Sequence, residues 1–278
     1  MPNSRRFKHS VTYWTLGLTE WNWDFDRICQ TAQALGIESI ELVPFEFLPK
    51  LASYGLTSAL ALNGMPDPPF ARGVNNPRYH EQIVVNTKNA IDECARFQMP
   101  NVIAFIGYKW VDALDPESGE ISRAEAIENS VKVLKEIAQY GAGRGVNVCL
   151  EHLNTRDSSH PMKGHPGYQG DDLDLVAEII RRAAMPNLRL LFDVYHVQIM
   201  HGDVIRRLRQ HADLIGHVHT AGNPGRGELD DRQEIHYPGV ARALAAIGYQ
   251  GFVGHEFIPT LDPVQGLSQA IELCEPSA

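Results

Sequence analysis

The alternation of short apolar runs with stretches of helical periodicity limits the fold of this chain more than any other feature. Runs typical of buried strands recur eight times, over residues 9–14, 37–43, 56–62, 101–106, 146–151, 188–193, 214–219 and 251–256. Between them, apolar residues recur at helical spacing, over residues 26–35, 79–97, 126–141, 173–182, 203–210, 238–247 and 263–273, and more weakly over 45–53. Strands that alternate with helices favour parallel pairing, because parallel neighbours need long crossover connections.

Eight strand and helix units in 278 residues match a (β/α)₈ TIM barrel in number and length. We therefore predict the α/β class and a single barrel domain over residues 1–278. A doubly wound open sheet is the alternative, because periodicity does not reveal whether a sheet closes. The longest loops, residues 63–76, 108–122, 155–170 and 221–236, follow predicted strands, so in a barrel they lie at the carboxyl ends where active sites form.

Composition excludes several classes of partner. The net charge of −9 and the pI near 5.7 argue against binding to nucleic-acid phosphates, and no stretch approaches the roughly 18 apolar residues of a membrane helix. The four cysteines lie far apart and form no C-x-x-C pair, which is typical of reduced thiols. We expect a cytoplasmic protein with a small-molecule partner, a polyol or keto acid, and leave a homo-oligomer open.

Four successive predicted strands each end on a side chain that can bind a metal: Glu151, Asp193, His219 and Glu256. No local motif links them, but strands five to eight of a barrel occupy one half of the ring, so their ends can converge. Three carboxylates and one imidazole suit Mn²⁺ or Mg²⁺ and also admit Co²⁺ or Zn²⁺. His217 competes with His219, because alternation puts both on the same face of a strand.

Three segments, "LLFDVYH", "IGHVHTAGNPGRGE" and "GYQGFVGHEF", resemble those of hydroxypyruvate isomerase and its relatives in the xylose-isomerase-like TIM-barrel superfamily of sugar isomerases and epimerases. The resemblance implies one divalent metal at the four strand-end residues, with His196 and Arg226 binding substrate oxygens. Hydroxypyruvate isomerases tend to carry glutamine where His219 stands. Histidine there is more similar to the ketose epimerases.

The same residues suit proton transfer next to a carbonyl. Moving a carbonyl between adjacent carbons requires removal of an α-proton and stabilisation of an enediolate, which a chelated metal favours. Our hypothesis is that Glu151 and Glu256 both ligate the metal and exchange protons on the two faces of a cis-enediolate. Return of the proton to the neighbouring carbon gives isomerisation, and return to the same carbon from the other face gives epimerisation.

Three alternatives stay open at this point. A lyase or dehydratase acting on a keto sugar would begin with the same enolisation. A metal-dependent nuclease shares the superfamily but would need further ligands and a basic face. A barrel that only binds a sugar or a partner subunit would keep the site without catalysis.

Further residues extend the predicted site to the loops. We expect a polar lid and an aromatic wall over the mouth, and no glycine-rich phosphate loop follows the last two strands, which favours unphosphorylated substrates. The lid and wall candidates are His160, Lys163, His165, Tyr168, Trp14 and Trp110, with Glu41 and Asn63 as weaker inward-facing candidates.

Overall fold

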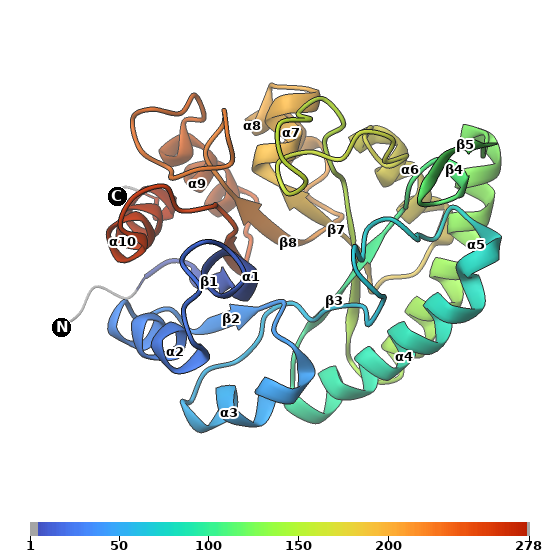
Figure 1. Ribbon diagram of the computed structural model, residues 1–278. Coiled ribbons are helices and arrows are strands. Elements are labelled where there is room, and N and C mark those ends of the chain that lie inside the picture. The colour runs from blue at the N-terminus through green and yellow to red at the C-terminus, as the bar shows by residue number, and fades with distance from the viewer. Residues whose placement is uncertain (1–4, 277–278) are drawn as a thin grey trace.

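A ring of parallel strands surrounded by helices makes up the computed structural model, which describes residues 5–276 (Figure 1). Seven strands form one parallel sheet in the order β2-β1-β9-β8-β7-β6-β3. They are β1 Lys8–Thr12, β2 Ser39–Glu41, β3 Asn101–Phe105, β6 Asn147–Glu151, β7 Leu188–Asp193, β8 Ile215–Thr220 and β9 Phe252–His255. All seven lie where the sequence predicted strands.

The ring closes through the segment between β2 and β3. Thr57 forms a parallel bridge with β2, and Ala61 forms one with β3. Ala59 between them donates its N–H to the Ser39 Oγ at 2.7 Å, and its carbonyl accepts from the Asn101 amide at 2.8 Å. Because side chains take these backbone groups, the predicted third strand is an extended segment with two isolated bridges, and the prediction of a regular strand there was wrong. Its position is as expected, and the sheet is a closed (β/α)₈ barrel rather than an open one.

The helices cover the outside of the ring (Figure 1), and their apolar faces pack on the outward-facing strand residues. The longest, α5, begins earlier than the periodicity predicts, because Ser122 and Glu125 form a capping box that starts it at Arg123. The predicted helices correspond to α2 Phe25–Ala34, α3 Leu48–Ser53, α4 His80–Phe97, α5 Arg123–Ala142, α6 Leu173–Ala183, α8 Val204–Gln210, α9 Tyr237–Ala246 and α10 Pro263–Cys274, with 3₁₀ turns η1 Phe45–Phe47 and η2 Pro77–Tyr79 before α3 and α4.

Four short elements were not predicted. Helix α1, Tyr13–Gly17, follows β1 directly, and the antiparallel hairpin of β4 Trp110–Asp112 and β5 Asp115–Glu120 lies within the loop after β3. Helix α7, Val194–Met200, begins directly after β7. No helix was predicted over residues 194–200. They are helical because the carboxylate at the end of β7 accepts hydrogen bonds from the first free N–H groups of α7.

The four cysteine thiols are buried and form no disulfide within residues 5–276, as expected. In that same part of the chain, no helix combines the length and the apolar character that crossing a membrane requires.

Candidate functional site

Four side chains from neighbouring strands converge at the carboxyl end of the barrel. Glu151 ends β6, Asp193 ends β7, His219 lies one residue before the end of β8, and Glu256 follows β9. One ligand atom from each lies within 4.8 Å of the ligand atoms of the other three, and all four side chains are buried. The register of the sheet, in which Asp193 pairs with His219, brings the ends to one level. The fold thus joins all four residues that the sequence analysis selected.

The two ring nitrogens of His219 face different partners. Nδ1 points toward the carboxylates, 3.0 Å from the Glu256 Oε2 and 3.7 Å from the Glu151 Oε1. Nε2 lies 3.0 Å from the Glu41 Oε1, deeper in the barrel. A carboxylate accepts a hydrogen bond from Nε2–H, so in the neutral imidazole this contact favours the tautomer whose Nδ1 lone pair is directed at the cluster.

Glu41, at the end of β2, connects both histidines of β8. Its other oxygen lies 2.9 Å from the His217 Nε2, and the carboxylate is fully buried. Burial opposes ionisation of Glu41, but the charges and hydrogen bonds of His217 and His219 outweigh it and hold its pKa well below the usual range. His217 and His219 share a face, as alternation predicts, but only His219 reaches the four-residue cluster.

Gly254 provides the space for this contact. A Cβ on Gly254 would lie 2.1 Å from the Glu41 Oε1 and 2.8 Å from the His219 Cδ2. Any larger residue would therefore push Glu41 away from the imidazole. The glycine in "GFVGHEF" indicates that a side chain from another strand packs directly against the backbone at this position.

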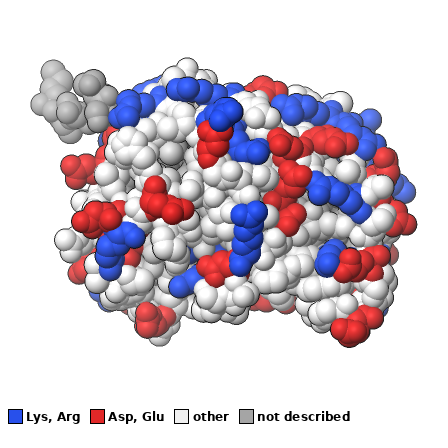
Figure 2. All heavy atoms as spheres, turned by 90° about the horizontal axis from the view of Figure 1, so that it is seen from above, with Lys and Arg blue, Asp and Glu red and all other residues white. Residues whose placement is uncertain are grey.

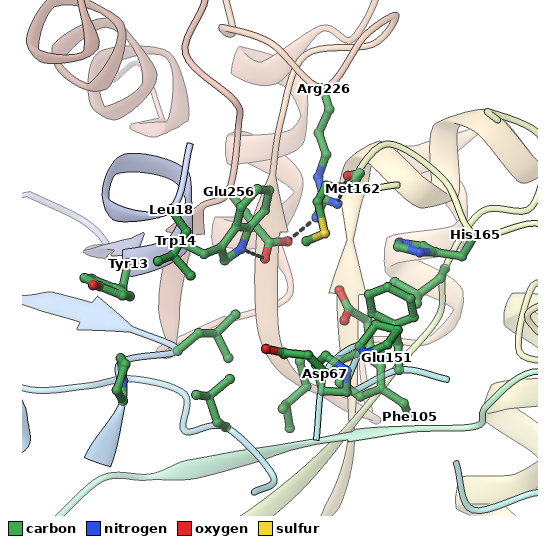
Figure 3. Close-up of a pocket in the computed structure, with 18 residues that line it drawn as sticks. Tyr13, Trp14, Leu18, Asp67, Phe105, Glu151, Met162, His165, Arg226 and Glu256 are labelled. Carbon is green, nitrogen blue, oxygen red and sulfur yellow. Dashed lines mark hydrogen bonds and ion pairs between the residues drawn. The ribbon is translucent and has the colours of Figure 1, made fainter. Parts of the chain in front are cut away.

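Glu256 is held from three directions, and Figure 3 shows two of its partners, Trp14 and Arg226. Its Oε1 accepts from the Trp14 Nε1 at 2.8 Å, and its Oε2 accepts from the buried Arg226 guanidinium and faces His219. Arg226 also donates to the Met162 carbonyl and lies 3.9 Å from the Asp193 Oδ2. The guanidinium therefore lies between the strand ends and the loop that contains Met162.

The two carboxylate oxygens of Asp193 have different partners. Its Oδ1 accepts from the N–H groups of Tyr195 and His196 at 2.8 and 3.1 Å and caps α7. Its Oδ2 faces Arg226 and lies 3.7 Å from the His196 Nε2. The His196 Nδ1 accepts from the Asn154 N–H at 3.1 Å, which fixes the ring behind the cluster.

Burial and like charges move the pKa values of the carboxyl groups apart. Burial raises the pKa of Glu151 to about 7, and the charges of Glu256 and Asp193 add to that rise while His219 opposes it. Burial also opposes ionisation of Glu256, but His219 and Arg226 outweigh it and lower its pKa to about 2. Burial raises the pKa of Asp193, against the effect of Arg226. Burial opposes the charge of His219, but Glu256, Glu151 and Glu41 raise its pKa well above the usual value.

This donor set fits a divalent cation. Among residues 5–276, neither the Glu151 Oε1 nor the His219 Nδ1 has a hydrogen-bond partner, although both atoms are buried. With His219 neutral, three carboxylates face one guanidinium, so a divalent cation would balance the charge. Buried charges are stable only when they are paired or coordinate a metal. Glu151, Asp193, His219 and Glu256 could therefore hold a metal ion.

A cavity of about 480 Å³ opens beside the cluster (Figure 3). Glu151 and Glu256 line it, together with Trp14, Arg226 and His165. Its remaining walls are mostly apolar and come from the opposite half of the ring. A ligand in this cavity would contact two carboxylates on one side and aliphatic or aromatic groups on the other.

The structure separates the lid and wall candidates. Trp14 and His165 line the cavity, whereas Tyr168 is buried and donates its hydroxyl to the Glu151 carbonyl, and Trp110 packs on Tyr108 in the hairpin region. His160 is exposed. Lys163 and Asn63 are absent from the described lining of the cavity, and so is His196, which was predicted to bind substrate. The loop of residues 155–170 therefore contributes one polar side chain, that of His165, to the cavity. Tyr168 instead supports the ends of β3 and β6.

Sequence reasoning missed most of the apolar wall. Phe70, Leu42, Leu62, Ile103 and Phe105 all line the cavity. Apolar residues within strands and loops carry no pattern that separates a cavity wall from a core. The proline-rich "PDPPF" at 66–70 was the available signal of an ordered loop.

A family model described as "Xylose isomerase-like TIM barrel" matches residues 29–276. The chain belongs to this family. The matched region contains every residue of the cluster, so the barrel and the strand-end carboxylates described above lie within the family domain.

Two named relatives of this family member match about half of the chain. A putative hydroxypyruvate isomerase of Homo sapiens is 39% identical over 119 residues, 43% of this chain and 41% of the relative. A 2-oxo-tetronate isomerase of Cupriavidus necator is 36% identical over 145 residues, 52% of this chain and 51% of the relative. The chain thus spans about half the length of these relatives, or less, in the matched segments.

The xylose isomerase-like barrel also resembles solved structures over nearly its whole length. The crystal structure of AP endonuclease, family 2, from Brucella melitensis has a TM-score of 0.78 and 25% identity, covering 95% of this chain and 97% of that one. Barrels of this shape therefore occur in proteins with different names, and the fold alone does not define the activity.

Proposed function

We propose that this protein is a divalent-metal-dependent isomerase of a small hydroxy-carbonyl compound, acting by proton transfer through a cis-enediolate. The observation that carries the proposal is the convergence of Glu151, Asp193, His219 and Glu256, two of which line the cavity. The isomerase names of the two relatives support it. The reaction type is that of hydroxypyruvate and tartronate semialdehyde interconversion, an intramolecular oxidoreduction of the aldose–ketose kind.

The four converging residues would hold one divalent metal, with Mn²⁺ or Mg²⁺ favoured by the oxygen-rich donor set and Co²⁺ or Zn²⁺ admitted by the imidazole. When bound, such an ion supplies Lewis-acid stabilisation of the negative charge that develops on the substrate oxygens. Glu41 holds the His219 tautomer that such a site needs.

Glu151 and Glu256 are the proposed proton carriers. Both line the cavity, and their pKa values are moved in opposite directions, so one carboxyl is ionised at neutral pH while the other retains a proton part of the time. Carboxyl pairs with separated pKa values are suited to acid and base roles in one reaction. One removes the α-proton and the other delivers a proton to the neighbouring carbon.

Arg226 and His196 are the proposed substrate-binding residues. The Arg226 guanidinium lines the cavity beside Glu256, where it can donate to a substrate oxygen. His196 lies behind Asp193 and reaches a substrate only after a side-chain rearrangement. Its Nε2 has no hydrogen-bond partner among residues 5–276, so a donor or acceptor remains free there.

Two related activities share the enolisation step, namely ketose epimerisation and loss of water from a keto sugar. Of these two, the epimerase has an observation in its favour, because the resemblance associates histidine at position 219 with ketose epimerases and glutamine with hydroxypyruvate isomerases. A nuclease is less well supported, because the chain has a net charge of −9 and the one face that Figure 2 shows mixes Lys and Arg with Asp and Glu.

We further propose that the chain works as one TIM-barrel domain in the cytoplasm. The ring uses strands from Lys8 to His255, so removal of any strand would open it. The buried, unpaired cysteine thiols suit a reducing compartment.

Deuterium uptake from D₂O tests the proposed reaction. The protein loaded with Mn²⁺, Mg²⁺ or Co²⁺ is expected to exchange the α-hydrogen of hydroxypyruvate or of a ketose, followed by NMR. A carbonyl moved to the next carbon identifies an isomerase, inverted configuration an epimerase, and loss of water a lyase. If no compound of the panel exchanges with any of the three metals, the proposal fails.

Replacing Glu41 by glutamine tests the positioning of His219. The Glu41→Gln protein keeps the shape of the side chain but loses the charge that favours the Nε2 proton, so its Mn²⁺ affinity is expected to fall about 10- to 100-fold. Calorimetric titration of metal-stripped protein measures this. Glu46→Gln, which removes a charge from an exposed residue of η1, should leave the affinity unchanged. Equal affinities in the two variants would contradict the role of Glu41.

A further inference from the structure

His165 brings a buried polar side chain to the wall of the cavity. The residue lines the cavity and is 2% exposed. Its Nδ1 is buried and has no hydrogen-bond partner among residues 5–276. Figure 3 shows the ring directed from its loop toward the space beside Glu151. Buried polar atoms are normally bonded, so an unbonded one on a cavity wall indicates a position for a polar group of a ligand.

The barrel holds the His165 ring in a fixed position. The His165 N–H donates to the Asn154 carbonyl at 2.8 Å, and the Asn154 side chain donates to the Lys163 carbonyl at 2.8 Å. These bonds tie the loop to the residues that follow β6. The imidazole packs on Phe70 with ring centroids 4.2 Å apart and lies 5.9 Å from the ring of His196. A side chain held in this way does not have to be ordered when a ligand binds.

The chemistry of the ring suits a hydroxyl. Burial lowers the pKa of His165 to about 3, and the charge of Arg226 adds to this effect, so the imidazole is neutral at physiological pH. A neutral imidazole has one donor and one acceptor nitrogen, and a hydroxyl can likewise donate and accept. A carboxylate gains most from a cationic donor, which is Arg226 among the described lining residues.

The cavity has room for such a hydroxyl beyond a three-carbon substrate. At a water's share of about 30 Å³ per heavy atom, hydroxypyruvate occupies roughly 200 Å³. The cavity measures about 480 Å³. Its apolar wall, which includes Phe70, Phe105 and Trp14, suits the C–H groups of the same tail. A polyol tail therefore finds partners for both kinds of its surface.

We infer that the substrate has a hydroxyl-bearing tail of at least one carbon beyond its hydroxy-carbonyl unit, and that His165 binds a hydroxyl of this tail. This inference rests on the proposed function and adds to it a specificity residue and a substrate class, polyhydroxy keto compounds of four or more carbons. On a four-carbon keto acid of this class, the reaction interconverts the 2-oxo and 3-oxo isomers. A proton leaves C3, a proton is added to C2, and the hydroxyl proton moves from the oxygen on C3 to the oxygen on C2, so no oxidant or reductant is consumed.

Two keto acids that differ in one hydroxyl test the contact. 3,4-Dihydroxy-2-oxobutanoate has the tail hydroxyl on C4, and 3-hydroxy-2-oxobutanoate has a methyl group there. With the Mn²⁺-loaded protein, the first is expected to exceed the second by about tenfold in kcat/KM for deuterium uptake at C3, the contribution of one well-made hydrogen bond. Initial rates are measured for both enantiomers, because the configuration at C3 determines which side of the cavity the tail reaches.

Variants of His165 link the preference to its ring nitrogen. His165→Phe keeps a ring beside Phe70 but has no hydrogen-bonding atom, so the ratio of the two compounds is expected to fall to about one while uptake into the methyl compound changes little. His165→Asn places an amide near the position of Nδ1 and should retain part of the preference. His236→Phe makes the same change at an exposed histidine whose side chain forms no capping hydrogen bond with α9, and should leave the ratio unchanged.

Magnetic resonance of the His165 ring gives a readout that does not depend on turnover. In protein with isotope-labelled histidine ring nitrogens, the Nδ1 resonance is assigned by its absence in the His165→Phe protein. It is expected to shift when 3,4-dihydroxy-2-oxobutanoate is added, and to stay in place with the methyl compound.

The outcomes separate this inference from the proposed function. A ratio near one in the unaltered protein, a ratio that His165→Phe leaves unchanged, or an equal loss with both compounds would overturn the hydroxyl contact and leave the isomerase standing. A shifted Nδ1 resonance in protein that exchanges neither compound would support the contact and overturn the proposed function. Absence of both exchange and shift would overturn both.

Discussion

Glu256→Gln is expected to lower deuterium uptake into substrate about 10²- to 10⁴-fold, the usual contribution of a positioned acid or base. The amide cannot accept and return the proton at neutral pH. It also offers one oxygen where Glu256 accepts from both Trp14 and Arg226, so one of these donors loses its partner. The loss is local, and the circular dichroism spectrum and most of the metal affinity are expected to remain.

Glu272→Gln is the matched control for this variant. Glu272 lies exposed on α10, and exchanging it removes the same charge without touching the cavity. Surface changes of this kind shift stability by about 0.5 kcal/mol or less. Persistent exchange in the Glu256→Gln protein, at the rate of the control, would refute the role of Glu256 as a proton carrier.

Removal of the metal is expected to have an effect of similar size. A bound metal would stabilise the enediolate-like transition state by several kcal/mol, so its removal by chelation and dialysis corresponds to about a 10³-fold loss of deuterium uptake. Mn²⁺ or Mg²⁺ at 100 times its dissociation constant should restore exchange and add about 2.7 kcal/mol to the free energy of unfolding. Exchange at the full rate in protein shown by elemental analysis to be metal-free would contradict the proposed cofactor.

The pH dependence of metal binding gives an independent readout. A metal ion competes with protons for its ligands, and burial raises the pKa of Glu151 to about 7 in the metal-free protein. The pKa of His219 is also raised, against its burial, by the neighbouring carboxylates. Both groups must lose their protons, so the Mn²⁺ affinity is expected to increase as the pH rises through about 7, with protons released on binding. Calorimetry in buffers of different ionisation enthalpy counts these protons.

Local sequence patterns determined the order and type of nearly all the larger elements. The alternation of period-two and helical patterns depends on which side chains face the core, and this requirement acts on each segment separately. It also placed Glu151, Asp193, His219 and Glu256 at the ends of consecutive strands. Parallel strands in a ring bring their carboxyl ends together, so the fold class alone predicted that these residues would meet.

Only the tertiary structure decided the features that depend on contacts between distant segments. Alternation of side chains along a strand puts His217 and His219 on the same face. Strand register and the contact with Glu41, for which Gly254 leaves room, determine that His219 is the one that reaches the cluster. Closure depended on side chains bonding the backbone of Ala59.

The apolar wall was equally invisible before the chain was folded. A leucine that faces a cavity and one that faces the core have the same local pattern, because both avoid water in the same way. The sequence alone therefore determined which residues can supply charge at the strand ends. The three-dimensional packing decided which side chains stand opposite them and leave room for a ligand.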